Sequence, residues 1–184
     1  MARGQAERLF GLLEELLAAA GAQWRDLCRI GVGIGPGNFT GTRISVAAAR
    51  GLALSLGIPA IGVSSLEALA IGLDGPVLCS VDARADQVYL QLFNNGRAEA
   101  PFQAGLDAIP SQVLPRGGIV IGHEADAIAQ RLGAVTGTQP VARAPAIAMI
   151  ASSRSVDPAL RPAPLYLRPA DAAPARDLAP RLLP

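Results

Sequence analysis

Apolar and polar residues near the beginning of the chain recur at helical spacing, and the pattern predicts a helix from Glu7 to Ala20. Three glutamates and Arg8 occupy one side of this helix, and Phe10 lies at the edge of the other. The apolar arc covers about 160°, which is wider than a single packing contact needs. It consists of Leu9, Leu12, Leu13, Leu16, Leu17 and Ala20.

A second, longer helix is predicted from Thr40 to Leu56, with Thr40 as its N-cap. A short strand, Cys28–Ile34, precedes it and runs directly into a tight turn formed by Gly35, Pro36, Gly37 and Asn38. The helix is apolar nearly all round apart from Arg43 and Arg50, so we expect it to be buried on most sides. Small side chains along it would let another helix approach closely: Ala47, Ala48, Gly51 and Ser55.

The pattern then changes from alternating strands and helices to a meander. A buried strand, Ala60–Val63, leads to Ser64 and Glu67, whose spacing is that of a capping box and predicts a short helix to about Ile71. Beyond residue 75 two strands follow in succession, then a third strand and two helices. These are Val77–Ala83, Gln87–Phe93, Gly118–Gly122, His123–Leu132 and Ala146–Ser153. The composition shift predicts an N-terminal unit over 1–75, a second unit over 76–155, and a proline-rich tail over 156–184 that packs on both.

Composition excludes several kinds of catalytic and metal-binding site. All sixteen basic residues are arginine, so the chain has no lysine for a Walker A motif or a Schiff base, and its single histidine excludes a multi-histidine metal site. The net charge of +1 does not suggest a surface that tracks phosphates. We expect Cys28 and Cys79 to be reduced, buried thiols of a cytoplasmic protein. The longest apolar run, 44–63, is a poor membrane span because Arg50, Gly57 and Pro59 interrupt it.

Three features could carry chemistry, and each also has a purely structural interpretation. The glycines at 31, 33, 35 and 37 lie between a strand and a helix, where phosphates often bind, but they fit no dinucleotide or P-loop motif. They are more typical of a tight turn and close backbone packing. His123 and Asp82 could act in acid–base chemistry, yet a helix-start histidine and a turn aspartate are commonly structural. No nucleophile elbow is present, since Leu66 stands where its second glycine would be.

A long segment of the chain resembles a known family. Residues 32–70, which read VGIGPGNFTGTRISVAAARGLALSLGIPAIGVSSLEALA, are similar to the bacterial TsaB (YeaZ) family, whose members belong to the machinery that makes threonylcarbamoyladenosine in tRNA. The upstream helix, the DARxxxVY segment at 82–89 and the PLYLRPAD segment at 164–171 resemble the same family. The resemblance implies an α/β fold of the actin/Hsp70-like ATPase (ASKHA) type in two lobes. Family members normally begin with three antiparallel strands, so we expect an N-terminal lobe that lacks its first strands, through a late start or a truncation.

The resemblance also implies a function without a catalytic or metal site in this chain. TsaB is similar to TsaD, which transfers the threonylcarbamoyl group to the adenosine beside the anticodon. TsaB binds TsaD, and the ATPase TsaE joins them. The expected partners are therefore a TsaD-like transferase, a TsaE-like ATPase and a second copy of the chain, with tRNA met only through the complex and no membrane. We expect no cofactor of its own, and ATP and a metal in the partner complex.

The first two helices are the expected contact surface for TsaD and for the homodimer. The predicted interface residues are Leu9, Leu12, Leu13, Leu16, Arg43, Ala47, Ala48, Arg50, Gly51 and Ser55. The residues expected to shape the loop and cap the second helix are Gly35, Pro36, Gly37 and Thr40. Two alternatives remain open: a glycoprotease or M22-type peptidase, and an ATP-binding protein similar to sugar kinases.

Overall fold

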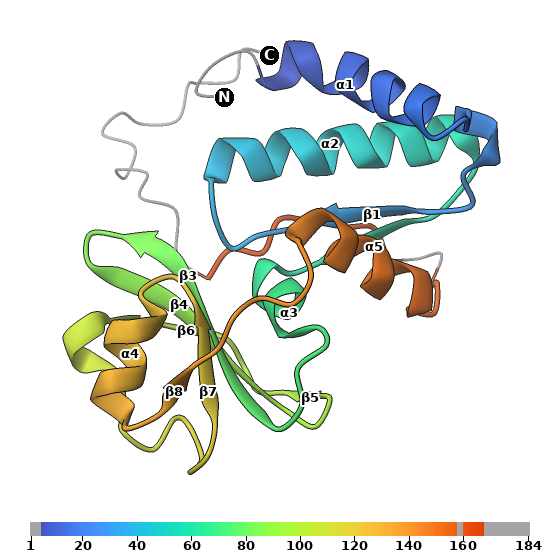
Figure 1. The fold of residues 1–184 in the computed structure, drawn as a ribbon. Coiled ribbons are helices and arrows are strands. Elements are labelled where there is room, and N and C mark those ends of the chain that lie inside the picture. Colours follow the sequence, from blue (N-terminus) through green and yellow to red (C-terminus); the bar gives the residue numbers. More distant parts are fainter. Residues whose placement is uncertain (1–4, 158–159, 168–184) are drawn as a thin grey trace, which may run out of the picture.

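The computed structural model describes residues 5–157 and 160–167 (Figure 1). Helix α1 (Gln5–Ala19) and a short 3-10 turn, η1 (Trp24–Asp26), precede the first sheet. That sheet is a pair of parallel strands, β1 (Ile30–Gly33) and β2 (Ala60–Val63), joined by α2 (Phe39–Leu56). The long helix is needed because parallel neighbours cannot be joined by a tight turn.

A second, larger sheet follows the short helix α3 (Ser65–Ala70). Its centre is β3, which pairs antiparallel with β4 and parallel with β7, while β5 and β6 pair with β4 and β8 pairs with β7. Helix α4 packs against β7 and β8. The elements are β3 (Pro76–Arg84), β4 (Gln87–Asn94), β5 (Arg97–Ala98), β6 (Phe102–Gly105), η2 (Leu106–Ala108), β7 (Ile119–Gly122), α4 (Ala125–Leu132) and β8 (Val135–Thr136).

The last helix, α5 (Arg143–Ser153), returns to the first sheet and packs on the face opposite α2. Successive residues of a strand point to opposite faces. Val32 is buried with Val46 and Ala49 of α2, whereas a Cβ added at Gly31 would lie 2.8 Å from the Cβ of Ala151 in α5. The prediction that the glycine run permits close backbone packing is therefore confirmed for Gly31.

Helix α3 lies between the two sheets and contributes to the core of both. Leu66 and Leu69 are buried against Cys79 and its neighbours in the second sheet. Ala68 belongs instead to a cluster that includes Ile61 of β2 and residues of α5. The predicted unit boundaries at 75 and 155 remain a prediction. The packing groups α5 with the first sheet even though it follows the second in sequence.

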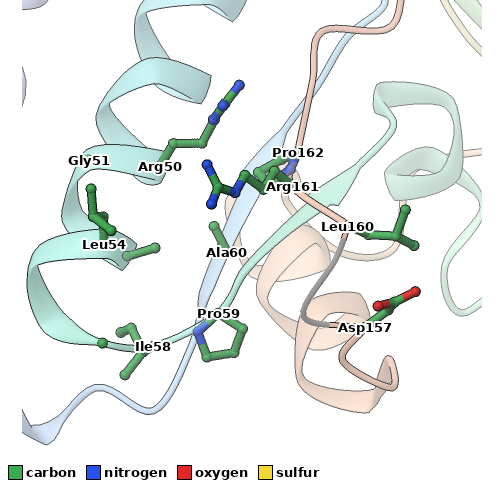
Figure 2. A pocket seen from close by; sticks show the side chains of 12 residues that line it. Arg50, Gly51, Leu54, Ile58, Pro59, Ala60, Asp157, Leu160, Arg161 and Pro162 are labelled. Carbon is green, nitrogen blue, oxygen red and sulfur yellow. The ribbon is translucent and has the colours of Figure 1, made fainter.

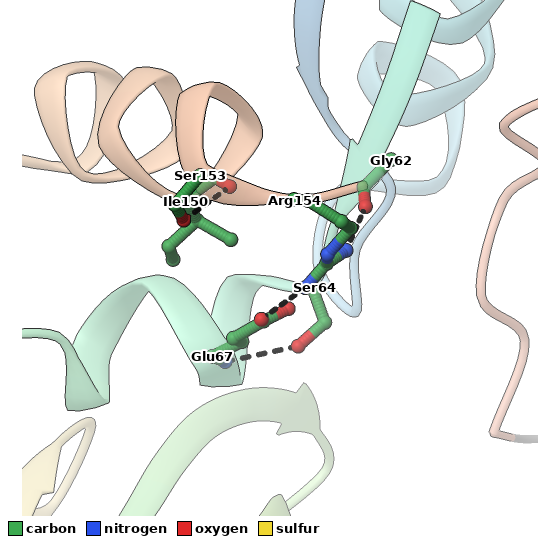
Figure 3. A network of polar contacts seen from close by, with 6 residues as sticks. All are labelled: Gly62, Ser64, Glu67, Ile150, Ser153 and Arg154. Carbon is green, nitrogen blue, oxygen red and sulfur yellow. Dashed lines mark hydrogen bonds and ion pairs between the residues drawn. The ribbon is translucent and has the colours of Figure 1, made fainter. Parts of the chain in front are cut away.

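A network of polar contacts links the end of α5 to β2 and α3 (Figure 3). The Arg154 guanidinium donates to the Gly62 carbonyl oxygen at 2.7 Å and forms an ion pair with the Glu67 carboxylate. Ser64 caps α3 by accepting from the Glu67 N–H at 2.9 Å, as predicted from the sequence. The Glu67 side chain does not complete the predicted capping box because it is turned toward Arg154.

Three local predictions are wrong. Thr40 is not the N-cap, because α2 begins at Phe39 and the Asn38 side chain accepts from the Gly41 N–H at 3.1 Å. Cys28 is exposed, since β1 begins two residues later than the predicted strand. Helix α2 is not buried on most sides; its fully buried residues are Val46, Ala49 and Ala53. Most of the predicted tail, residues 168–184, lies outside the described residues.

Candidate interaction surface

One side of α2 is exposed to solvent although it carries few charges. Val46, Ala49 and Ala53 face the sheet, and the opposite side holds Gly51 and Leu54. Leu54 is 83% exposed, and a Cβ added at Gly51 would meet nothing within 4 Å. Of the predicted interface residues on this helix, Ala48 is half-buried, and the exposed ones are Arg43, Ala47, Arg50, Gly51 and Ser55.

Helix α1 adds a second uncovered apolar surface. Figure 1 shows α2 between β1 and α1, so α1 is the outermost layer on this side. Leu9 and Leu13 are half-buried, whereas Leu12 is 40% and Leu16 59% exposed. Phe10 is exposed as well. The structure therefore divides the predicted leucine stripe into an inner half and an outer half.

The sequence prediction did not include Leu54 in the interface. Its signal was present, because Leu54 follows Arg50 by four residues and Gly51 by three, and such positions share one face of a helix. Large exposed apolar side chains beside small ones are typical of a surface that another helix covers. We refer to the exposed residues of α1 and α2, namely Phe10, Leu12, Leu16, Ala47, Arg50, Gly51, Leu54 and Ser55, as the helical face.

The glycine-rich loop fixes where α2 starts. Gly35 and Gly37 have φ values of 90° and 153°, which favour glycine, and Gly35 is joined to Pro36 by a cis peptide bond. Gly35 and Pro36 are buried, and the Gly35 carbonyl accepts from the Ser65 N–H at 2.7 Å. Thr40 is exposed in the first turn of α2. The loop is therefore anchored to the start of α3, and its position orients the helical face.

Arg43 is already engaged within the chain, unlike Arg50. Its guanidinium carbon lies 3.8 Å from the centre of the Phe39 ring, and its Nε donates to the Tyr166 hydroxyl at 2.7 Å. The Leu165 N–H also donates to the Ile34 carbonyl at 2.8 Å. Two segments more than 120 residues apart thus meet beside the N-terminus of α2.

The candidate catalytic groups form no nucleophile–base pair among the residues that the structure describes. Asp82 accepts from the backbone N–H of Arg84 at 2.7 Å, in a turn where Arg84 has a φ of 65°. His123 Nε2 lies 3.9 Å from the Asp82 carboxylate, and both side chains are about half exposed. The Ser80 hydroxyl is buried without a hydrogen-bond partner.

Metal-binding and membrane-spanning features are also absent from the part of the chain that the structure describes. Within 5–157 and 160–167 there is no group of three or more histidine, cysteine or acidic side chains able to hold a metal ion. Nor does any helix in those ranges have both the length and the apolar character needed to cross a bilayer. The buried thiol of Cys79 has its pKa raised from 9.0 to about 12 by burial, so it stays protonated and unreactive near neutral pH.

This α/β fold is shared with known proteins. A family model described as TsaD, tRNA N6-adenosine threonylcarbamoyltransferase, matches residues 1–148, and the chain belongs to this family. Its named relatives are TsaB proteins, as the sequence resemblance predicted. It is 38% identical to TsaB of Escherichia coli over 92 residues, and 39% identical to TsaB of Bacillus subtilis over 125 residues.

Coverage differs between these relatives. The aligned region spans 40% of the E. coli protein and 55% of the B. subtilis protein, less than two thirds of either. A protein of Mycobacterium tuberculosis described as uncharacterized is 36% identical over 175 residues, which is 94% of this chain and 79% of that protein.

Solved structures share the fold. YeaZ from Pseudomonas aeruginosa matches with a TM-score of 0.66 and 25% identity, covering 80% of this chain and 76% of that one. A second structure, described as an uncharacterized protein with similarity to peptidase YEAZ from Pseudomonas aeruginosa, matches with a TM-score of 0.68 and 27% identity. It covers 89% of this chain and 84% of the other. The mixed α/β fold of the YeaZ type is therefore confirmed.

Proposed function

We propose that this chain takes part in the synthesis of threonylcarbamoyladenosine in tRNA as a non-catalytic subunit that binds a TsaD-like transferase. The names of its TsaB relatives support the pathway. The observation that carries the subunit role is the helical face, where Leu54 and Leu16 remain largely exposed beside the small side chains of α2.

The helical face suits a partner that presents helices of its own. Gly51 leaves room for close approach, since no atom lies within 4 Å of where its Cβ would be. A partner helix packed here would remove Leu16 and Leu54 from water, at about 25 cal/mol for each Å² of apolar surface buried. The same face could be covered by a second copy of this chain, in a homodimer that exchanges for the transferase.

Catalysis then belongs to the partner complex. The Asp82 carboxylate is occupied by the backbone of its own turn, and His123 is exposed beside it. We propose that ATP and a metal are supplied by the TsaD-like and TsaE-like partners, that tRNA meets this chain only through them, and that the complex works in the cytoplasm.

Reconstitution with partners from the same genome tests the proposal. Threonylcarbamoyl transfer to tRNA is measured with the TsaD-like and TsaE-like proteins, with and without this chain. We expect transfer to require the chain, to survive Asp82→Ala and His123→Ala, and to be lost with Gly51→Leu.

Two results would reject the subunit role. One is transfer at the full rate without this chain. The other is proteolytic activity of the purified chain that disappears with Asp82→Ala or His123→Ala, which would favour the peptidase alternative.

A further inference from the structure

An open hollow of about 440 Å³ lies beside the C-terminal half of α2 (Figure 2). Its walls come from three segments: α2 itself, the turn that leads into β2, and residues 160–162 near the C-terminus. Ala53, Leu54, Ile58 and Pro59 make much of its lining apolar. The volume falls in the range of about 300–1,000 Å³ that is usual for small-molecule sites.

Two arginines, Arg50 and Arg161, bring positive charge to this hollow (Figure 2). Neither guanidinium forms an ion pair or a hydrogen bond with another described residue. The acid that also lines the hollow, Asp157, already has an interaction of its own. With Asp157 counted, the lining carries two positive charges and one negative charge, so its net positive charge favours an anion.

Both arginines are carried on well-anchored backbone. Arg50 is flanked on α2 by Ala49 and Ala53, which are buried against the first sheet. Arg161 precedes the buried Pro162, whose Cβ lies 3.3 Å from the position that a Cβ at Gly62 would take. The two positive charges are therefore attached to elements that the core holds in place.

We infer that this hollow binds an organic phosphate. A phosphate monoester carries a charge of about −1.5 to −2 at neutral pH, and its oxygens accept the paired N–H donors that each arginine presents. Its organic part would rest on the apolar wall formed by Leu54, Ile58 and Pro59. The hollow borders the helical face and shares Arg50, Gly51 and Leu54 with it, whereas Arg161, Ile58 and Pro59 lie outside that face.

Titration with three matched probes tests the inference. Phenyl phosphate, inorganic phosphate and phenol are added to the ¹⁵N-labelled chain, and the amide signals of Gly51, Gly57 and Ala60 are followed. We expect saturable shifts with phenyl phosphate, weaker binding of inorganic phosphate and none of phenol. Lowering the pH from 7.5 to 5 should weaken binding several-fold, because the second phosphate ionisation lies near pH 6.

Arginine variants identify the contact. Arg50→Gln and Arg161→Gln should each lower the affinity for phenyl phosphate about tenfold or more, the usual effect of losing one charge-assisted hydrogen-bonding partner. The exposed Arg131 of α4 supplies the matched control, and Arg131→Gln should leave the affinity unchanged.

The inference is overturned if millimolar phenyl phosphate leaves the three amides unshifted, or if Arg161→Gln binds it as the unmodified chain does. The outcome for the proposed function is separate. A chain with Arg161→Gln should lose affinity for phenyl phosphate and still bind the TsaD-like partner, because Arg161 lies outside the helical face.

Discussion

Replacing Gly51 should change stability and partner binding in opposite directions. The isolated fold should become more stable, and binding to the partner should weaken. Glycine inside a helix costs about 0.5–1 kcal/mol relative to a good helix former. A Cβ added at Gly51 meets no atom within 4 Å, so Gly51→Leu introduces no clash in the isolated chain. We expect the free energy of unfolding to rise by about 0.5–1 kcal/mol, and the melting temperature by about 1–4 °C for a chain of this size.

Binding of the Gly51→Leu chain to its partner should weaken. A leucine at 51 fills the space that lets a second helix approach α2, and neighbouring backbones must then separate or repack. We expect binding to a TsaD-like protein to weaken at least tenfold, which corresponds to about 1.4 kcal/mol. Urea denaturation of the isolated chain and sedimentation velocity of the mixture measure the two quantities.

Gly31 provides the matched control within the same chain. There a Cβ would lie 2.8 Å from the Ala151 Cβ and 3.2 Å from the Ile147 carbonyl oxygen. Gly31→Ala should therefore destabilise the fold by about 1–3 kcal/mol through overpacking. If Gly51→Leu destabilises the chain as Gly31→Ala does, the exposed side of α2 has been misjudged. If it binds the partner with unchanged affinity, the helical face is not the interface.

Four further predictions concern local contacts. Asn38→Ala should lower the free energy of unfolding by about 1 kcal/mol through loss of the α2 N-cap, whereas Thr40→Ala should change it by less than about 0.5 kcal/mol, both measured by urea denaturation. Cys28 should react with a thiol reagent in the native chain and Cys79 only after unfolding, as mass spectrometry would show. Burial raises the pKa of Cys79 from 9.0 to about 12, so with rising pH the thiol ionises in the unfolded chain before it does so in the folded chain. The free energy of unfolding, measured by denaturation at several pH values, should therefore decline as the pH rises above 9.0. Arg154→Met should cost about 1–2 kcal/mol by removing the bonds that tie β2 and α3 to the end of α5, and unchanged stability would contradict that role.

Local sequence signals were reliable where one segment contains all of the interacting atoms. The Ser64 cap of α3 needs only an N–H three residues away, and it was predicted correctly. The N-cap of α2 was misplaced because Asn38 and Thr40 are both good capping residues. The conformation of the preceding loop selects Asn38, and two residues of sequence cannot reveal that conformation.

The pattern of residues along the chain was enough to predict the family resemblance, the order of most elements and the apolar stripes of the first two helices. Tertiary structure decided which parts of those stripes are covered. Helical periodicity shows which residues share a face, but whether another element lies over that face depends on how distant segments pack. The sequence already places Leu54 on one helix face with Arg50 and Gly51, but only the structure shows that this face is uncovered. The same reason applies to Arg50 and Arg161, since 110 residues of chain separate two charges that only folding brings to one hollow.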